Sequence, residues 1–147
     1  MKLFKTIFYL LITLSSINSY SQVITRKTIK IDRIKSLIKT ANHDTVKIQL
    51  LKQWADIAFL TDTDEDLRLQ KEIINICEIN LANNLENKTE KWFKEEQWIA
   101  LDHIGSIYLY DYEKAKEALK YYIPSAEILE QLNHLNSSSI TYDIIGN

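Results

Sequence analysis

The stretch "IALDHIGSIYLYDYEKAKEALKYY" (residues 99–122) places Gly105 inside an apolar, helix-like run. The chain has only two glycines, and Gly146 follows an isoleucine in the same way in "DIIGN". A glycine inside a helix costs about 1 kcal/mol relative to alanine. That cost is offset where the missing side chain lets a second helix approach closely, which predicts a tightly packed helix pair. We therefore expect Gly105→Leu to unfold the pair and Gly105→Ala to cost little.

The pattern around Gly105 recurs along the chain. "IALDHIGS" (99–106) aligns with "ITYDIIGN" (140–147) at an offset of 41 residues, which pairs the two glycines. "LLKQWADIAF" (50–59) aligns with the same helix and puts Ala55 where the glycine stands. Helix pairs that recur every 40 to 50 residues or so are typical of an α-solenoid, in which each pair buries its apolar face against its neighbours.

Apolar residues recur at intervals of three and four along most of the chain, which predicts amphipathic helices. With 2 glycines and 1 proline in 147 residues, the composition favours helices and offers few turn signals. We predict an all-α fold in which antiparallel helix pairs stack as a short α-solenoid. The expected helices span 31–42, 45–60, 64–83, 89–110 and 112–132, with the start of another at 137–147.

Two local features concern individual helices. Thr63 and Asp66 have the spacing of a capping box at the start of the helix expected at 64–83. Pro124 falls inside the helix expected at 112–132, where it removes a backbone hydrogen bond and clashes with the preceding turn. We expect a kink or a break at Pro124.

Residues 1–21, "MKLFKTIFYLLITLSSINSYS", have the features of a secretory signal peptide: a basic start, a short apolar run and small residues before the cleavage point. The apolar run is shorter than the roughly 20 residues of a membrane span, although a retained membrane anchor is the alternative. We expect a linker at 22–30 and a folded domain at 31–147. The protein is accordingly expected to be exported, to the periplasm or beyond the cell.

The charge balance concerns the kind of partner. Removal of the signal peptide takes away two lysines and leaves 16 basic against 20 acidic side chains, a net charge of −4. An acidic chain without a basic stripe argues against nucleic acid as a partner.

The sequence contains no catalytic motif: it has no Ser-His-Asp set, no glycine-rich phosphate loop and no paired carboxylates of a cleft. We therefore expect no enzyme activity and no cofactor. His43, His103 and His134 stand far apart without ligands at metal-binding spacing, so no metal site is expected. Cys77 alternates with isoleucines at helical spacing and is interpreted as a small buried apolar residue.

The residues around Gly105 also follow a known signature. Leu101, Ile104, Gly105 and Tyr108 have the spacing Leu-x-x-Leu-Gly-x-x-Tyr, and Ala118-x-x-x-Tyr122 has the spacing of the second helix. At these residues the sequence resembles the tetratricopeptide repeat family. The turn glycine of the family is absent, and "LYDYEK" (109–114) stands in its place.

The resemblance implies three units: a degenerate repeat at 45–83, a clear repeat at 89–133 and a truncated repeat at 137–147, after a leading helix at 31–42. It also implies which residues pack the repeats together: Leu101, Ile104, Gly105, Tyr108, Ala118, Tyr122 and Gly146.

Tetratricopeptide arrays bind extended peptides in the groove that the first helix of each pair lines. Carried over by alignment, the groove residues are Gln49, Lys52, Asp56, Asp102, Ser106, Tyr110, Asp143 and Asn147. Because three of them are aspartates and one is a lysine, we expect no clamp for a terminal carboxylate and a neutral or basic protein partner. The resemblance thus implies a non-catalytic module for protein–protein interaction.

The combination of signal peptide and long repeats resembles exported tetratricopeptide proteins of Bacteroidota type. In that group such repeats often precede a histidine kinase or a DNA-binding module. The alternative function is therefore a periplasmic sensory input region of a truncated signalling receptor, attached to the inner membrane. The incomplete repeat at 137–147 indicates either a fragment of a longer chain or self-association through the C-terminal helix.

Overall fold

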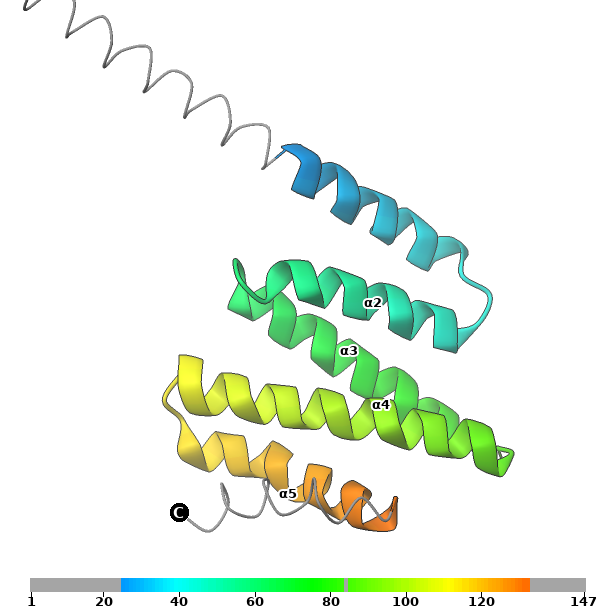
Figure 1. Ribbon diagram of the computed structural model, residues 1–147, viewed down its shortest axis with the longest axis vertical. Helices are drawn as coiled ribbons and strands as arrows, with labels where there is room; N and C mark the ends of the chain where they lie inside the picture. The colour runs from blue at the N-terminus through cyan, green and yellow to red at the C-terminus, as the bar shows by residue number, and fades with distance from the viewer. Residues whose placement is uncertain (1–24, 84, 133–147) are drawn as a thin grey trace, which may run out of the picture. The chain divides into compact units, whose positions relative to one another are not determined.

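The computed structural model describes residues 25–83 and 85–132, and all regular secondary structure within these residues is helical (Figure 1). The all-α prediction is confirmed for this part of the chain. The expected signal peptide, and the expected last helix with Asp143, Gly146 and Asn147, lie outside the described residues.

The described chain holds five helices and divides into two units between Thr40 and Ala41. The helix of the first unit spans 25–40, so it begins inside the segment that was expected to be a linker. Arginine and lysine, which are good helix formers, occupy much of its first turns. The helices of the second unit are α2 (Asp44–Ala58), α3 (Thr63–Leu81), α4 (Asn87–Ser106) and α5 (Ala115–Gln131).

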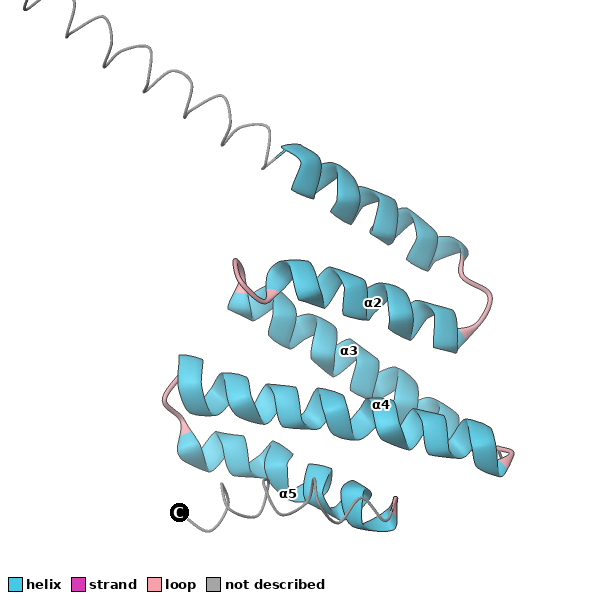
Figure 2. Cartoon of the chain, in the orientation of Figure 1, coloured by secondary structure: helices cyan, strands magenta, loops and turns pink. Residues whose placement is uncertain are grey.

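The helices of the second unit pack mainly in the order of the sequence: α2 on α3, α3 on α4 and α4 on α5. Short connections reverse the chain between them, so neighbouring helices run antiparallel (Figure 2). Within the described residues no substantial contact joins α2 to α5, so these helices form an open array and not a closed bundle. None of the described helices is both long and apolar enough to cross a membrane.

The core of this array is built from one apolar stripe per helix, as the three-and-four spacing predicts. The stripes meet along the helix interfaces and exclude water there. The largest fully buried hydrophobic side chains of the described residues are Ile48, Leu51, Leu69, Ile73, Ile104, Tyr122 and Leu129.

The start of α3 differs from the expected capping box. The capping oxygen belongs to Asp62, whose carboxylate accepts a hydrogen bond of 3.0 Å from the backbone N–H of Glu65. Asp66 turns inward instead and is 1% exposed. The capping role predicted for Thr63 and Asp66 is therefore wrong, because an acidic residue one position before the expected cap performs it.

Gly105 of α4 faces the Tyr122 ring of α5. A Cβ atom added at Gly105 would stand 2.7 Å from Cε1 of the Tyr122 ring, well inside van der Waals contact. The ring is fully buried, and its hydroxyl lies 3.0 Å from Oγ of Ser106, so both ends of Tyr122 are held. This contact argues against the expectation that Gly105→Ala costs little, because even one methyl group would meet the buried aromatic ring.

A π-helical turn, η1 (Ile107–Asp111), follows α4 directly. Its widened turn is closed by the backbone N–H of Tyr112, which donates to the carbonyl of Ile107 at 3.2 Å. Glu113 then adopts a positive φ of 54°. This residue reverses the chain where the tetratricopeptide signature has a glycine.

We expect Glu113→Gly to raise the free energy of unfolding by about 0.5–1 kcal/mol. A side chain in the left-handed region costs about 1–2 kcal/mol, of which glycine's greater freedom in the unfolded chain cancels part. Urea denaturation followed by circular dichroism measures the difference. Glu113→Ala is the matched control, since it removes the charge but keeps the Cβ; equal stability of the two variants would contradict the assignment.

Pro124 does not end α5, which continues as one helix from Ala115 to Gln131. Of the two expected outcomes, the break is therefore wrong, and the kink stays a prediction. The next residue supplies an additional link, because the Ser125 hydroxyl donates a hydrogen bond of 3.3 Å to the carbonyl of Trp98 in α4. Packing of α5 along α4 offsets the backbone hydrogen bond that the proline lacks.

Candidate partner-binding site

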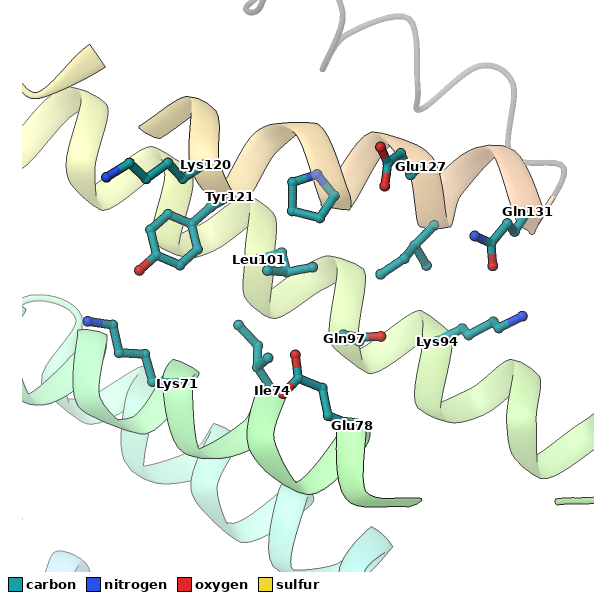
Figure 3. A pocket seen from close by; sticks show the side chains of 12 residues that line it. Lys71, Ile74, Glu78, Lys94, Gln97, Leu101, Lys120, Tyr121, Glu127 and Gln131 are labelled. Atoms are coloured by element: carbon teal, nitrogen blue, oxygen red, sulfur yellow. The ribbon is translucent and has the colours of Figure 1, made fainter. Parts of the chain in front are cut away.

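Two hollows lie on opposite faces of α4. The first, here named the α3–α5 groove, has a volume of about 540 Å³ and runs between α3 and α5 over α4 (Figure 3). Its apolar lining includes Ile74, Leu101, Pro124 and Ile128.

The cations of the α3–α5 groove are already engaged within the protein. Lys94 lies 2.8 Å from Glu90, and Lys120 lies 2.8 Å from Glu117. The Lys71 ammonium stands 5.9 Å from the centre of the Tyr108 ring, at cation–π distance. Figure 3 shows Lys71 and Lys120 at the end of the groove next to Tyr121. The lysines of the groove are thus matched within the protein, whereas Glu78 and Glu127 line it as exposed carboxylates.

The second hollow, here named the α2–α4 pocket, has a volume of about 290 Å³. It is lined by side chains of α2, α3 and α4: Lys52, Ala55, Asp56, Phe59, Asp66, Gln70, Ile99 and His103. The face of α4 that lines it lies half a helical turn away from the face that lines the α3–α5 groove.

A buried polar cluster forms one wall of the α2–α4 pocket. Nε2 of His103 lies 2.8 Å from Oδ2 of Asp66, and Nε2 of Gln70 donates to Oδ1 of Asp66 at 3.1 Å. The hydrogen bond to Asp66 raises the pKa of His103 above its usual value, against the opposing effect of burial. His103 therefore carries a proton over a wider pH range than a free imidazole and balances the buried carboxylate.

Of the other charged side chains of the pocket, Lys52 has an ion-pair partner, whereas Asp56 has none within the described residues. Lys52 lies 2.6 Å from Glu96, which neutralises its charge. Asp56 is exposed, and no ion pair or hydrogen bond involves its carboxylate among the residues that the structure describes. Phe59 borders the pocket with its ring 5.5 Å from that of His103, in an edge-on arrangement. The pocket therefore combines an unmatched carboxylate with an exposed aromatic ring.

The structure brings together only part of the predicted groove. Lys52 and Asp56 line the α2–α4 pocket, and Gln49 is exposed on α2 outside it. Ser106 bonds to Tyr122 on the side of α5.

Asp102 and Tyr110 also lie outside the α2–α4 pocket. Asp102 is half-buried, and this burial raises the pKa of its carboxyl group. Tyr110 is exposed beyond the end of α4.

The residues expected to pack the repeats are placed as follows. Leu101, Ile104 and Gly105 are buried in α4, and Ala118 and Tyr122 are buried in α5. Tyr108 is half-buried and stacks on Tyr121, with ring centres 5.4 Å apart and planes 10° apart.

Among the pocket residues that sequence reasoning missed, Asp66, Gln70 and His103 form the polar cluster. A signal existed, because Asp66 shares the three-and-four spacing of the apolar stripe with Leu69 and Ile73. A carboxylate on a buried stripe requires a polar partner. Its partner His103 lies 37 positions away, however, and only the packing of α3 on α4 identifies it.

Metal and thiol chemistry find little support in the described part of the chain. Residues 25–83 and 85–132 contain no group of three or more His, Cys, Asp or Glu side chains suited to hold a metal ion. Cys77 is buried in α3, and burial raises the pKa of its thiol to about 12. This side chain acts as an apolar core residue.

Comparison of the chain with protein-family models, curated proteins and solved structures found no match.

Proposed function

We propose that this chain is a non-catalytic interaction module that binds a neutral or basic protein segment at the α2–α4 pocket. The observation that carries the proposal is the exposed apolar border of a pocket whose unmatched charge is negative. Phe59 is 55% exposed and Ile99 is 40% exposed, and both line the pocket together with Asp56. Exposed apolar groups that rim a polar hollow are typical of interaction sites.

The arrangement of the helices supports the tetratricopeptide interpretation of this site. The pocket lies between α2 and α4, the first helices of two successive antiparallel pairs, which are the helices that line the groove in that family. An open array also leaves such a face accessible along its length. The predicted groove residues Lys52 and Asp56 line this pocket.

The α3–α5 groove is the rival binding site, since it is the larger of the two. Its lysines, however, are matched by Glu90 and Glu117 or lie against Tyr108. A ligand there would have to compete with contacts that the protein makes with itself. The apolar residues that line the α3–α5 groove are buried or half-buried, whereas Phe59 and Ile99 of the α2–α4 pocket are exposed and available to a partner.

The proposal is tested by selecting random phage-displayed peptides against the protein and measuring their affinity for two variants. Phe59→Ala is expected to weaken binding about tenfold or more, because it removes the largest exposed apolar group of the pocket. Ile74→Ala, which trims the α3–α5 groove, is the matched control and is expected to leave affinity within about twofold.

Loss of binding in Ile74→Ala with retention in Phe59→Ala would assign the peptides to the α3–α5 groove and contradict the proposal. A selection that enriches no peptide over an unrelated helical protein would contradict the interaction function itself. Circular dichroism of each variant shows whether the fold is retained.

A further inference from the structure

We infer that the α2–α4 pocket receives a lysine or arginine side chain of the bound segment, and that protonated His103 competes with this side chain. The inference rests on the proposed function and specifies the chemistry of the partner. Its basis is the set of charged groups around the pocket and their distances.

The first step concerns the charge that a ligand meets. Lys52 is neutralised by Glu96 at 2.6 Å, so the pocket presents the carboxylates of Asp56 and Asp66. Asp66 is balanced only while His103 carries a proton. The pocket therefore offers one unbalanced negative charge when His103 is protonated and two when it is neutral.

The second step concerns shape. The pocket has a volume of about 290 Å³, at the lower end of the range for ligand pockets, which is room for one long side chain. Lysine and arginine carry an apolar stem that packs on apolar surface while the charged head reaches a polar group. Phe59 and Ile99 offer that surface, and Asp56 offers the carboxylate.

The third step concerns His103 and the groups that face it. Asp66 from α3 contacts its ring, and Asp102 from α4 and Asp111 from η1 act on it at longer range. Lys52 and Asp56 from α2 line the same pocket. A ligand cation in the pocket repels the proton on His103, so by linkage each weakens the binding of the other.

This competition determines the direction in which affinity for a basic side chain changes with pH. The hydrogen bond from Asp66 raises the pKa of His103. Affinity for a basic side chain is therefore low where His103 is protonated and rises as the pH increases through this pKa. A binding site formed without His103 would show no such change.

Three synthetic peptides provide the test: acetyl-Ala-Leu-Arg-Leu-Ala-amide and its counterparts with Gln or Glu in place of Arg. Isothermal titration or NMR titration measures their affinity between about pH 6 and pH 8. The Arg peptide is expected to bind at least about fivefold more tightly than the Gln peptide, and the Glu peptide most weakly. The Arg affinity is expected to rise severalfold with pH in the wild-type protein and to stay constant in His103→Gln.

Asp56→Asn is expected to remove most of the preference for Arg. Glu127→Gln, which removes an exposed carboxylate of the α3–α5 groove, is the matched control and is expected to preserve the preference. Equal affinities of the three peptides, absence of binding by the Arg peptide, or an unchanged pH profile in His103→Gln would overturn the inference. If peptides selected from the random library still depend on Phe59, the proposed function stands in each of these cases.

Discussion

The Gly105→Leu variant is expected to remain unfolded under conditions in which the wild-type chain folds. The Tyr122 ring occupies the space above Gly105, and already a single added carbon would lie 2.7 Å from it. A leucine would force α4 and α5 apart along the interface that carries much of the core. Far-ultraviolet circular dichroism and the melting profile of the purified variant measure the loss.

Gly105→Ala tests the same contact without abolishing the fold. Overpacking costs about 1–3 kcal/mol, while the better helix propensity of alanine returns about 1 kcal/mol. We expect a net loss of stability in the wild-type background and a gain in a Tyr122→Leu background, where the ring is gone. A double-mutant cycle in urea gives the coupling, and additive effects of the two substitutions would contradict the contact.

Replacing Asp66 with alanine is expected to lower the free energy of unfolding by about 2–3 kcal/mol. The substitution leaves His103 and Gln70 without their shared acceptor inside the α2–α4 pocket. This loss is smaller than the loss expected on breaking a fully buried ion pair, because His103 remains partly accessible to water. Urea denaturation measures it. Asp66→Asn is the control, since it keeps the shape and one acceptor oxygen, and it should lose less.

The pH dependence of stability distinguishes the contribution of the His103–Asp66 ion pair from that of packing. The folded pKa of His103 is raised above its unfolded value of about 6.5. The stabilisation is therefore complete below that value and is lost as the pH rises through the folded pKa. The wild-type protein should lose stability over this range and Asp66→Ala should not; parallel curves would contradict the assignment.

Much of the fold follows from local pattern, which the sequence carries directly. The apolar spacing predicted the bounds of α2 and α3 to within a few residues, because the spacing that defines each helix is formed by residues of that helix alone. The turn after α4 was harder to predict, because glutamate rarely adopts a positive φ and nothing in the sequence marks Glu113 as an exception. The continuity of α5 across Pro124 likewise depends on packing against another helix.

The candidate site was less accessible to prediction because its residues meet only through packing. Alignment of the first helices grouped Lys52 with Asp56, and both line the α2–α4 pocket. It could not show that Ser106 points to Tyr122, nor that Asp66 reaches across from α3 to His103. Such contacts depend on the rotation of each helix about its axis, which periodicity alone fixes only to a broad face.

The burial of Cys77 gives this protein an internal reporter of its own motions. It is the only cysteine of the chain, and in the native state it is enclosed in α3 with a thiol pKa of about 12. A thiol reagent such as a disulfide dye can therefore react only after α3 has opened to solvent. At low reagent concentration the labelling rate reports the free energy of that opening. At high concentration the rate levels off at the rate constant of opening, and no engineered probe is needed.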